Sequence, residues 1–344
     1  MYLFLLTSIY RRSVEMPPKT KKVVKPRRSK AKLKPKSKPK SKPKSKPKSK
    51  PKPKAKQVYV QPPKLDNITY LDNNGTTKMC DKAKNAIISW MQSCANPSSD
   101  SVVARRSKDM LNKTRKFILK HCSTNSVKHS VIFTSGASES NCLILLSVVD
   151  AYKKHTDNKP HIITSATEHK SIIQCCNVLK SQGRADITYI EPNAYGCISP
   201  ALIERSITST TALISIMAAN NELGCINDLK KIGTIAHKHK VPFHTDAVQL
   251  FGKYRIPVVA SKIDAMSMSF HKLYGPMGLG LLILSNELID GYGLQGQIAG
   301  SQQNALRGGT ENVPSIAGAI PAIQCTFDRR MDKNRKMFNL KNLF

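Results

Sequence analysis

The nine cysteines of this chain include no Cys-x-x-Cys pair, and Cys175 and Cys176 are merely adjacent. This absence argues against a zinc site and against a disulfide framework, and it favours a reducing compartment. The apolar start Met1–Ile9 is too short to span a bilayer, and no small-residue cleavage site follows it. We therefore predict a protein with no metal site and no membrane span.

Acidic residues are scarce, with 22 Asp and Glu against 56 Lys and Arg. Residues 17–56 contain no acid and no aromatic residue, and a Lys-Pro-Lys-Ser repeat fills much of them. Dense proline forbids a helix and like charges repel, so we expect an extended, disordered tail. The tail is either a spacer or a site of non-specific contact with nucleic acid or another polyanion, which we slightly favour. Base stacking is excluded because aromatic residues are missing.

The composition also suggests how the chain is divided. Met16 opens a second plausible start, so residues 1–15 need not be translated. We expect a basic tail over residues 1–56, a large domain over 57–305, and the beginning of a small C-terminal domain over 306–344. We expect a cytoplasmic protein, with nuclear import as an alternative because the tail contains Pro-Arg-Arg-Ser-Lys.

Short apolar strands alternate with helix-like stretches from about residue 129. Near-continuous apolar strands in such an alternation predict an α/β fold with a mainly parallel sheet covered on both faces. Ligands of such sheets lie beyond the carboxyl ends of the strands. The expected strands are His129–Ser135, His161–Ala166, Ile187–Glu191, Thr211–Ala218, Val241–Thr245, Ala265–Phe270 and Gly280–Leu284, and the expected helices Ser138–Val149, Ser171–Ser181 and Ile226–Lys240.

One lysine stands between a buried strand and a Gly/Pro-rich bend. Lys272 follows the apolar run Ala265–Phe270, and Gly275 with Pro276 opens the bend. A desolvated amine has a lowered pKa and forms Schiff bases with carbonyl compounds. Most lysines beside turns are simply solvated, so Lys272 indicates carbonyl chemistry only together with other residues.

Four more strand ends carry residues suited to one cofactor. The small residues 134–138 precede a helix start, where backbone N–H groups and the helix dipole favour a phosphate. Asp246 could hydrogen-bond a protonated ring nitrogen, His169 could stack on a ring or move a proton, and Asn221 ends the fourth strand. Each also has a plain reading as a capped turn, a helix cap or a solvated side chain. Together with Lys272 they predict a pyridoxal phosphate site.

Eight segments of the sequence connect this prediction with a known protein family. They are Tyr70–Thr77, Asn96–Ser99, Thr134–Ser140, Thr167–Lys170, Asn220–Gly224, Asp246 with Gln249, Ser269–Pro276 and Arg307–Thr310. In the residues of these segments and in their order along the chain, the sequence resembles the NifS-like cysteine desulfurases, which are pyridoxal-phosphate-dependent enzymes of the class V aminotransferase group. The resemblance covers nearly all of residues 70–320. It implies the type I fold of pyridoxal phosphate transferases.

The resemblance also implies roles for individual residues. Lys272 would carry the cofactor, Asp246 would keep the pyridine nitrogen protonated, and His169 would stack on the ring and assist proton transfers. Gln249 would hydrogen-bond the ring hydroxyl, with Asn221 near it and near the substrate carboxylate. The phosphate would be held by Ala137, Ser138, Ser269 and His271, and by Thr310 of the other subunit of a homodimer.

The implied reaction converts L-cysteine to L-alanine and passes the sulfur to a mobile cysteine thiolate, and then to an acceptor in iron–sulfur cluster biogenesis. That cysteine normally follows the Arg-x-Gly-Thr stretch, where this chain has only Cys325, in an apolar segment that reads as a helix. The arginine that holds the substrate carboxylate also comes from the family's C-terminal part. We therefore expect a truncated small domain and doubtful full activity. Val102, Ser138 and Gln303 depart from the histidine, threonine and glutamate that the family usually has at these positions.

Two alternatives stay open. One is another pyridoxal phosphate activity on the same fold, such as selenocysteine lyase. The other is a non-catalytic, polyanion-binding protein whose enzyme-like domain is a remnant. The sulfur acceptor is not indicated by the sequence.

Overall fold

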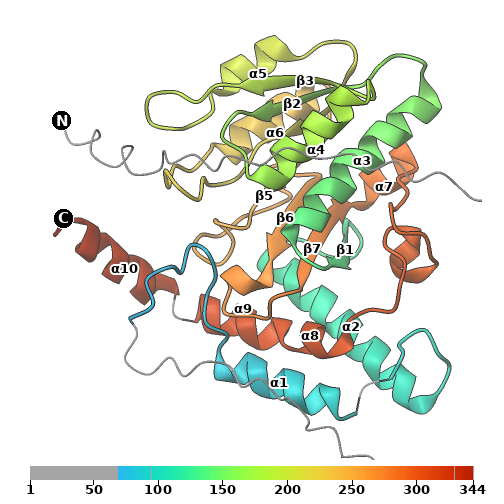
Figure 1. Cartoon of the computed structure of the whole chain (residues 1–344), viewed down its shortest axis with the longest axis vertical. Coiled ribbons are helices and arrows are strands. Elements are labelled where there is room, and N and C mark those ends of the chain that lie inside the picture. The colour runs from blue at the N-terminus through green and yellow to red at the C-terminus, as the bar shows by residue number, and fades with distance from the viewer. Residues whose placement is uncertain (1–68, 94, 329, 344) are drawn as a thin grey trace, which may run out of the picture. The chain divides into compact units, whose positions relative to one another are not determined.

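The computed structural model describes residues 69–343 apart from 94 and 329, and they belong to one compact unit, Asp66–Phe344 (Figure 1). The tail expected at 17–56 and the alternative start at Met16 lie outside the described residues. The domain boundary expected at 305 stays a prediction. No helix of residues 69–343, gaps aside, combines the length and the apolar character that a bilayer crossing needs.

A seven-stranded sheet forms the centre of the unit, in the order β1-β7-β6-β5-β4-β2-β3. Strands β6, β5, β4, β2 and β3 pair in parallel, whereas β7 runs antiparallel to both β1 and β6. The strands are β1 (His129–Thr134), β2 (His161–Ser165), β3 (Asp186–Ile190), β4 (Thr211–Ser215), β5 (Phe243–Asp246), β6 (Ala265–Ser269) and β7 (Gly280–Ser285). The predicted mainly parallel sheet is confirmed.

Helices cover both faces of this sheet. One apolar core lies under α3, α4 and α7, and the other lies under α2, α5, α6, α8 and α9. The helices are α1 (Asp81–Met91), α2 (Val102–His121), α3 (Ala137–His155), α4 (Lys170–Ser181), α5 (Pro200–Ser206), α6 (Leu229–Lys238), α7 (Asn286–Tyr292), α8 (Val313–Ala317), α9 (Ala319–Phe327) and α10 (Arg330–Lys341), with 3₁₀ turns η1 (Phe270–Lys272) and η2 (Gln302–Ala305).

The strands are apolar throughout because successive side chains enter opposite cores. Ile162 belongs to the core under α3 and Ile163 to the other. Leu282 and Ile283 divide in the same way on β7. A strand buried on both faces shows no alternation of polar and apolar residues, which explains the continuous runs in the sequence.

The expected elements are all present, with ends shifted by a few residues. The helix expected over Ile226–Lys240 begins only at Leu229, and Asp228 caps it by accepting a hydrogen bond from the N–H of Lys231. Asn227 does not cap this helix, because its amide bridges Ile198 and Met217. The apolar segment around Cys325 is helix α9, as predicted.

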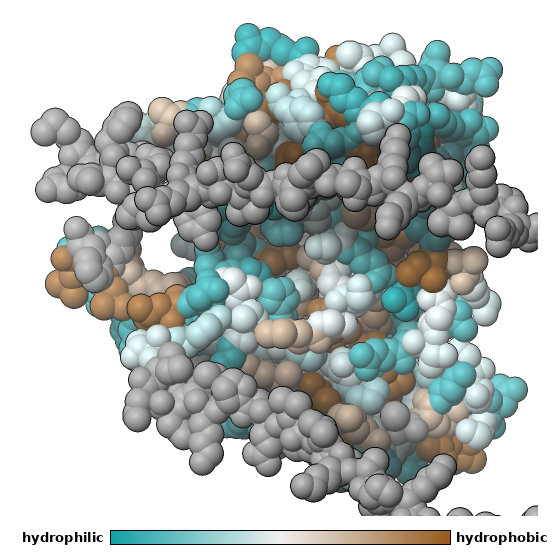
Figure 2. Space-filling model, viewed as in Figure 1, coloured by the Kyte–Doolittle hydropathy of each residue, from teal (hydrophilic) through white to brown (hydrophobic). Residues whose placement is uncertain are grey.

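The last helices differ in how well they are packed. α8 and α9 lie against α1 (Figure 1). α10 instead exposes its large apolar side chains, among them Met331 and Phe338 (Figure 2).

Candidate active site

A cavity of about 730 Å³ opens beyond the carboxyl ends of the parallel strands. Nine of the ten site residues predicted from the sequence line it, contributed by five separate segments of the chain. They are Ala137, Ser138, His169, Asn221, Asp246, Gln249, Ser269, His271 and Lys272. The tenth, Thr310, is exposed and lies outside this lining. The fold therefore brings together residues that are up to 135 positions apart.

The phosphate-binding turn predicted at residues 134–138 lies between β1 and the N-terminus of α3. The first N–H groups of a helix have no acceptor within the helix, and those of α3 start at Ala137 on the cavity wall. A side chain built on Gly136 would meet no atom within 4 Å, so this wall faces open space. Ser138, Ser269 and His271 add polar side chains around it.

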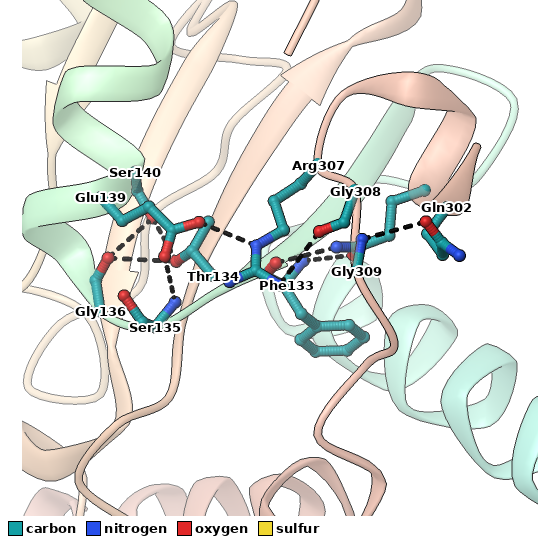
Figure 3. A network of polar contacts seen from close by, with 11 residues as sticks. Phe133, Thr134, Ser135, Gly136, Glu139, Ser140, Gln302, Arg307, Gly308 and Gly309 are labelled. Atoms are coloured by element: carbon teal, nitrogen blue, oxygen red, sulfur yellow. Dashed lines mark hydrogen bonds and ion pairs between the residues drawn. The ribbon is translucent and has the colours of Figure 1, made fainter. Parts of the chain in front are cut away.

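A network of polar contacts holds this turn in place (Figure 3). Glu139 accepts a 2.8 Å hydrogen bond from the N–H of Ser135 and a 2.9 Å bond from Nε of Arg307. Partial burial raises the pKa of Glu139, but these bonds outweigh it and the pKa is lowered overall. Gln303 accepts from the N–H of Phe133 and donates to its C=O, at 2.7 and 2.9 Å.

The contact of Gln303 explains one departure from the family's usual residues. β1 is an edge strand, so the backbone of Phe133 has free groups on one side. A glutamine amide donates and accepts like another strand, whereas an ionised glutamate only accepts. Gln303 therefore satisfies both groups of the strand that leads into the phosphate turn.

Asp246 ends β5 on the floor of the cavity, 4% exposed. Its Oδ2 accepts a 2.8 Å hydrogen bond from Asn141, and its Oδ1 accepts a 3.0 Å bond from the N–H of Val248. Burial raises the pKa of Asp246, while the bond from Asn141 and the charges of His169 and Lys272 oppose the shift. Asn141 was not predicted, although it lies one helical turn beyond Ala137.

Lys272 ends the 3₁₀ turn η1 and reaches the cavity from the side of β6. Its amine donates to the C=O of Asn74, which also accepts from Gln249 at 3.4 Å. The amide of Asn74 donates in turn to the C=O of Asn221. Burial lowers the pKa of Lys272, against the opposing charges of Asp72 and Asp246. Asn74 thus links three predicted residues, although only the segment that contains it was singled out from the sequence.

His169 stands at the N-cap of α4, on the cavity wall. Its Nδ1 accepts a hydrogen bond from the N–H of Ser171 at 3.2 Å and lies 2.8 Å from the hydroxyl of Ser171. These contacts hold the imidazole ring through Nδ1, so Nε2 is the ring nitrogen that can contact a ligand. The capping contact shows that His169 has a structural role as well as its place in the cavity.

Glu168, next to His169, is a buried acid to which sequence reasoning gave no role. Its Oε1 accepts from the N–H of Met217 at 2.7 Å and from Ser165 at 3.1 Å, while Oε2 is buried and has no hydrogen-bond partner among the residues that the structure describes. Burial raises its pKa to about 8, although the N–H of Met217 opposes the shift. Such an acid is neutral near neutral pH.

The residues present fit pyridoxal phosphate. The cavity offers an amine with a lowered pKa for the aldehyde, a buried carboxylate for the ring nitrogen, and a helix N-terminus for the phosphate. The buried Oδ1 of Asn141, beside Asp246, has no partner within the described residues. No cysteine lines this cavity in the described part of the chain, and Cys325 lies in α9.

Comparison with known proteins agrees with this geometry. Residues 69–338 match the family model for aminotransferase class V. The putative cysteine desulfurase IscS 1 of Bacillus subtilis is 35% identical over 276 residues, which is 80% of this chain and 70% of the relative. The cysteine desulfurase IscS of Methanosarcina thermophila is 35% identical over 274 residues, 79% of this chain and 66% of the relative. The chain thus spans roughly two thirds of the length of these relatives.

Solved structures give the same family. SspA in complex with cysteine superposes with a TM-score of 0.70 at 36% identity, over 75% of this chain and 72% of that one. A NifS-like protein superposes with a TM-score of 0.73 at 30% identity, over 79% and 73%. This chain therefore belongs to the class V aminotransferase family, whose cysteine desulfurase branch depends on pyridoxal phosphate and contains its relatives.

Proposed function

We propose that this chain binds pyridoxal phosphate at Lys272 and uses it to remove sulfur from L-cysteine. The observation that carries the proposal is that one cavity contains the amine of Lys272, the carboxylate of Asp246 and the N-terminus of α3. The names of its relatives, cysteine desulfurases, support the substrate and the reaction. When bound, the cofactor withdraws electrons from the substrate Cα, which no protein side chain does.

Asp246 and Lys272 have complementary roles in this proposal. Asp246, held by Asn141, would keep a proton on the ring nitrogen, because a buried carboxylate stabilises a positive charge beside it. The lowered pKa of Lys272 raises the fraction of neutral amine, so Lys272 would hold the cofactor aldehyde and, once the substrate amine had displaced it, would be free to accept a proton from the substrate Cα. The C=O of Asn74 orients this amine.

Three further residues would orient the ligands. His169 would stack on the ring and pass protons through Nε2, since Ser171 occupies Nδ1. Gln249 would contact the ring hydroxyl from its place beside Asn74. Asn221, tethered by Asn74, would face the substrate carboxylate.

The sulfur must leave on a thiol that the described cavity does not supply. L-cysteine and a thiol then give L-alanine and a persulfide, with the sulfur atom moving from the substrate to the attacking thiolate. We infer that a soluble thiol such as dithiothreitol can act as the acceptor. Because the described cavity contains no thiol, selenocysteine lyase activity is the second candidate. The C–Se bond is weaker than the C–S bond, so it can break with a weaker attacking group.

The experiment has two parts. The purified chain mixed with pyridoxal phosphate should develop a visible absorption band that is lost in Lys272→Ala and kept in the surface variant Lys230→Ala. Alanine and sulfide are then measured with L-cysteine and dithiothreitol, and alanine is measured with L-selenocysteine. A band that survives in Lys272→Ala would refute the assignment of the lysine, and alanine from selenocysteine alone would favour the second candidate.

We also propose a homodimer in which Thr310 reaches the phosphate of the other subunit, because Thr310 is exposed and lies outside the cavity of its own chain. Mixing Thr310→Ala and Lys272→Ala chains tests this proposal. If the site is shared, a mixed dimer has one cavity that lacks both groups and one that is intact. Polyanion contact through residues 17–56 remains a proposal, tested by salt-dependent DNA binding of the full chain.

A further inference from the structure

Two loops lie side by side next to the cavity, and each carries a cysteine. Cys197 lies in the loop after β3, and Cys225 ends the turn Asn220–Cys225 after β4. The N–H of Ile198 donates at 2.8 Å to the side chain of Asn227, which fixes the loops against each other. This pair was not singled out by its sequence context.

The two thiols meet across this contact. The thiol of Cys225 donates to the C=O of Gly196 at 2.9 Å, and the thiol of Cys197 donates to the C=O of Ile226 at 3.7 Å. Each thiol therefore lies against the residue next to the other cysteine. These crossed contacts bring the two cysteines together from different loops, and a disulfide needs such proximity.

Both side chains are half-buried, so a small oxidant can reach them. The pKa of Cys225 is raised by burial and by Cys197 beside it, so little of its thiol is ionised near neutral pH. In contrast, Cys122 and Cys176 are buried, and burial raises their pKa further, in keeping with inert core thiols.

We propose that Cys197 and Cys225 are a redox modification site, which closes into a reversible disulfide under oxidising conditions. With a low-molecular-weight disulfide as oxidant, the Cys197 thiolate attacks one sulfur and releases one thiol. The Cys225 thiolate then displaces the second thiol and forms the protein disulfide. Two protein thiols lose two electrons and two protons, and the oxidant becomes two thiols.

A disulfide between Cys197 and Cys225 would restrain the loop that carries Asn221. The N–H of Asn220 donates to the C=O of Cys225 at 3.0 Å, so Asn221 lies within the turn that Cys225 closes. Cross-linking this turn to the β3 loop restricts its motion. This consequence for ligand binding rests on the role proposed for Asn221, whereas formation of the bond does not.

The test maps the bond by mass spectrometry after oxidation of the full chain with glutathione disulfide. Trypsin places Cys197 in the peptide 185–205 and Cys225 in the peptide 206–230, and each peptide contains one cysteine. We expect the two to be recovered joined and lighter by two hydrogens, and to separate with dithiothreitol. The joined protein should also unfold at a temperature higher by about 5 °C, because a cross-link restricts the unfolded chain.

Two controls make the result decisive. Cys197→Ser and Cys225→Ser should each abolish the joined peptide and the thermal shift, whereas Cys142→Ser, at a partly buried cysteine of α3, should keep both. Slower hydrogen exchange over residues 219–226 in the oxidised protein would show that the turn is restrained. If both peptides stay separate while glutathione modifies other cysteines, or if Cys197 pairs elsewhere, the proposal is wrong. Neither outcome depends on bound cofactor or on desulfurase activity.

Discussion

Glu139 and Arg307, 168 residues apart in the chain, form an ion pair with 2.9 Å between Oε1 and Nε. Through its other oxygen Glu139 binds the N–H of Ser135, in the turn that we assign to the cofactor phosphate. Arg307 opens the Arg-Gly-Gly-Thr segment that contains Thr310. The pair therefore connects the phosphate turn to the segment that we propose to reach the other subunit (Figure 3).

Replacing Glu139 by Gln should weaken cofactor binding by about fivefold. The variant keeps an oxygen for the N–H of Ser135 but loses the charge that binds Arg307, and a half-buried pair of this kind contributes about 1 kcal/mol. The measurement is a titration of absorbance with pyridoxal phosphate. Asp150→Asn breaks the partly buried pair between Arg184 and Asp150, away from the phosphate turn, and should leave the affinity unchanged. Equal losses in both variants would show a general effect of charge rather than control of the turn.

Replacing Asn141 by Ala should weaken cofactor binding and make it more sensitive to acid. Its hydrogen bond stabilises the ionised form of Asp246, so removal raises the pKa of Asp246 further. Because the ring nitrogen needs the carboxylate, affinity is lost as pH falls through that pKa, and the loss should begin at a higher pH in the variant. A hydrogen bond to a charged group contributes about 1.5–3 kcal/mol.

The measurement is the same titration, repeated from pH 5 to pH 9. Asn177→Ala, which breaks only an exposed bond to Tyr189, is the matched control. If the pH dependence of Asn141→Ala matched that of the wild type, Asn141 would not act through Asp246.

The sequence predicted which residues stand at the strand ends, but it did not predict the contacts that these residues make. Lys272 and Asp246 were found because each follows an apolar run, a local signal that survives in one sequence. The pairs Glu139–Arg307 and Asn141–Asp246 join residues far apart in the chain, and no local pattern encodes such a contact.

The antiparallel direction of β7 has a signal in the length of the segment that precedes it. Only ten residues separate Ser269 from Gly280, whereas a parallel crossover needs a dozen or more. Helices α1 and α2 were not predicted either, because they precede the alternation of strands and helices that begins at about residue 129. They pack with α8 and α9, so their place in the fold depends on segments some 200 residues later.

Replacing Glu168 by Gln should change how stability depends on pH. The pKa of Glu168 is about 8 in the folded chain and close to 4.5 when unfolded, so the folded state holds an extra proton between these values. The stabilisation that Glu168 contributes to the folded state is complete below pH 4.5, and it is lost as the pH rises through 8. Gln cannot lose a proton, so relative to wild type the variant should gain more than about 1 kcal/mol from pH 5 to pH 9.

Urea unfolding at pH 5, 7 and 9 measures this difference. Glu191→Gln, at an exposed position, should follow the wild type at every pH. A constant difference between Glu168→Gln and wild type would mean that Glu168 is ionised in the folded chain at pH 5.

Replacing Gly280 by Ala should displace the phosphate turn, because Gly280 packs directly against the backbone of that turn. Gly280 begins β7, and a Cβ there would lie 2.4 Å from the carbonyl carbon of Gly136 and 2.9 Å from the nitrogen of Ala137. These atoms belong to backbone, which cannot move aside as a flexible side chain can. The turn must therefore shift, and the N–H groups of α3 shift with it. We expect a loss of roughly 1–3 kcal/mol in stability and at least tenfold weaker cofactor binding.

Gly291→Ala provides the comparison, because a Cβ at that helical position meets nothing within 4 Å. Alanine favours a helix over glycine by about 1 kcal/mol, so this variant should be as stable as wild type or more so, with unchanged affinity. Thermal unfolding separates the stability effect from the cofactor titration. A Gly280→Ala protein that unfolds early but binds cofactor normally would show that the phosphate turn does not depend on the close approach of β7.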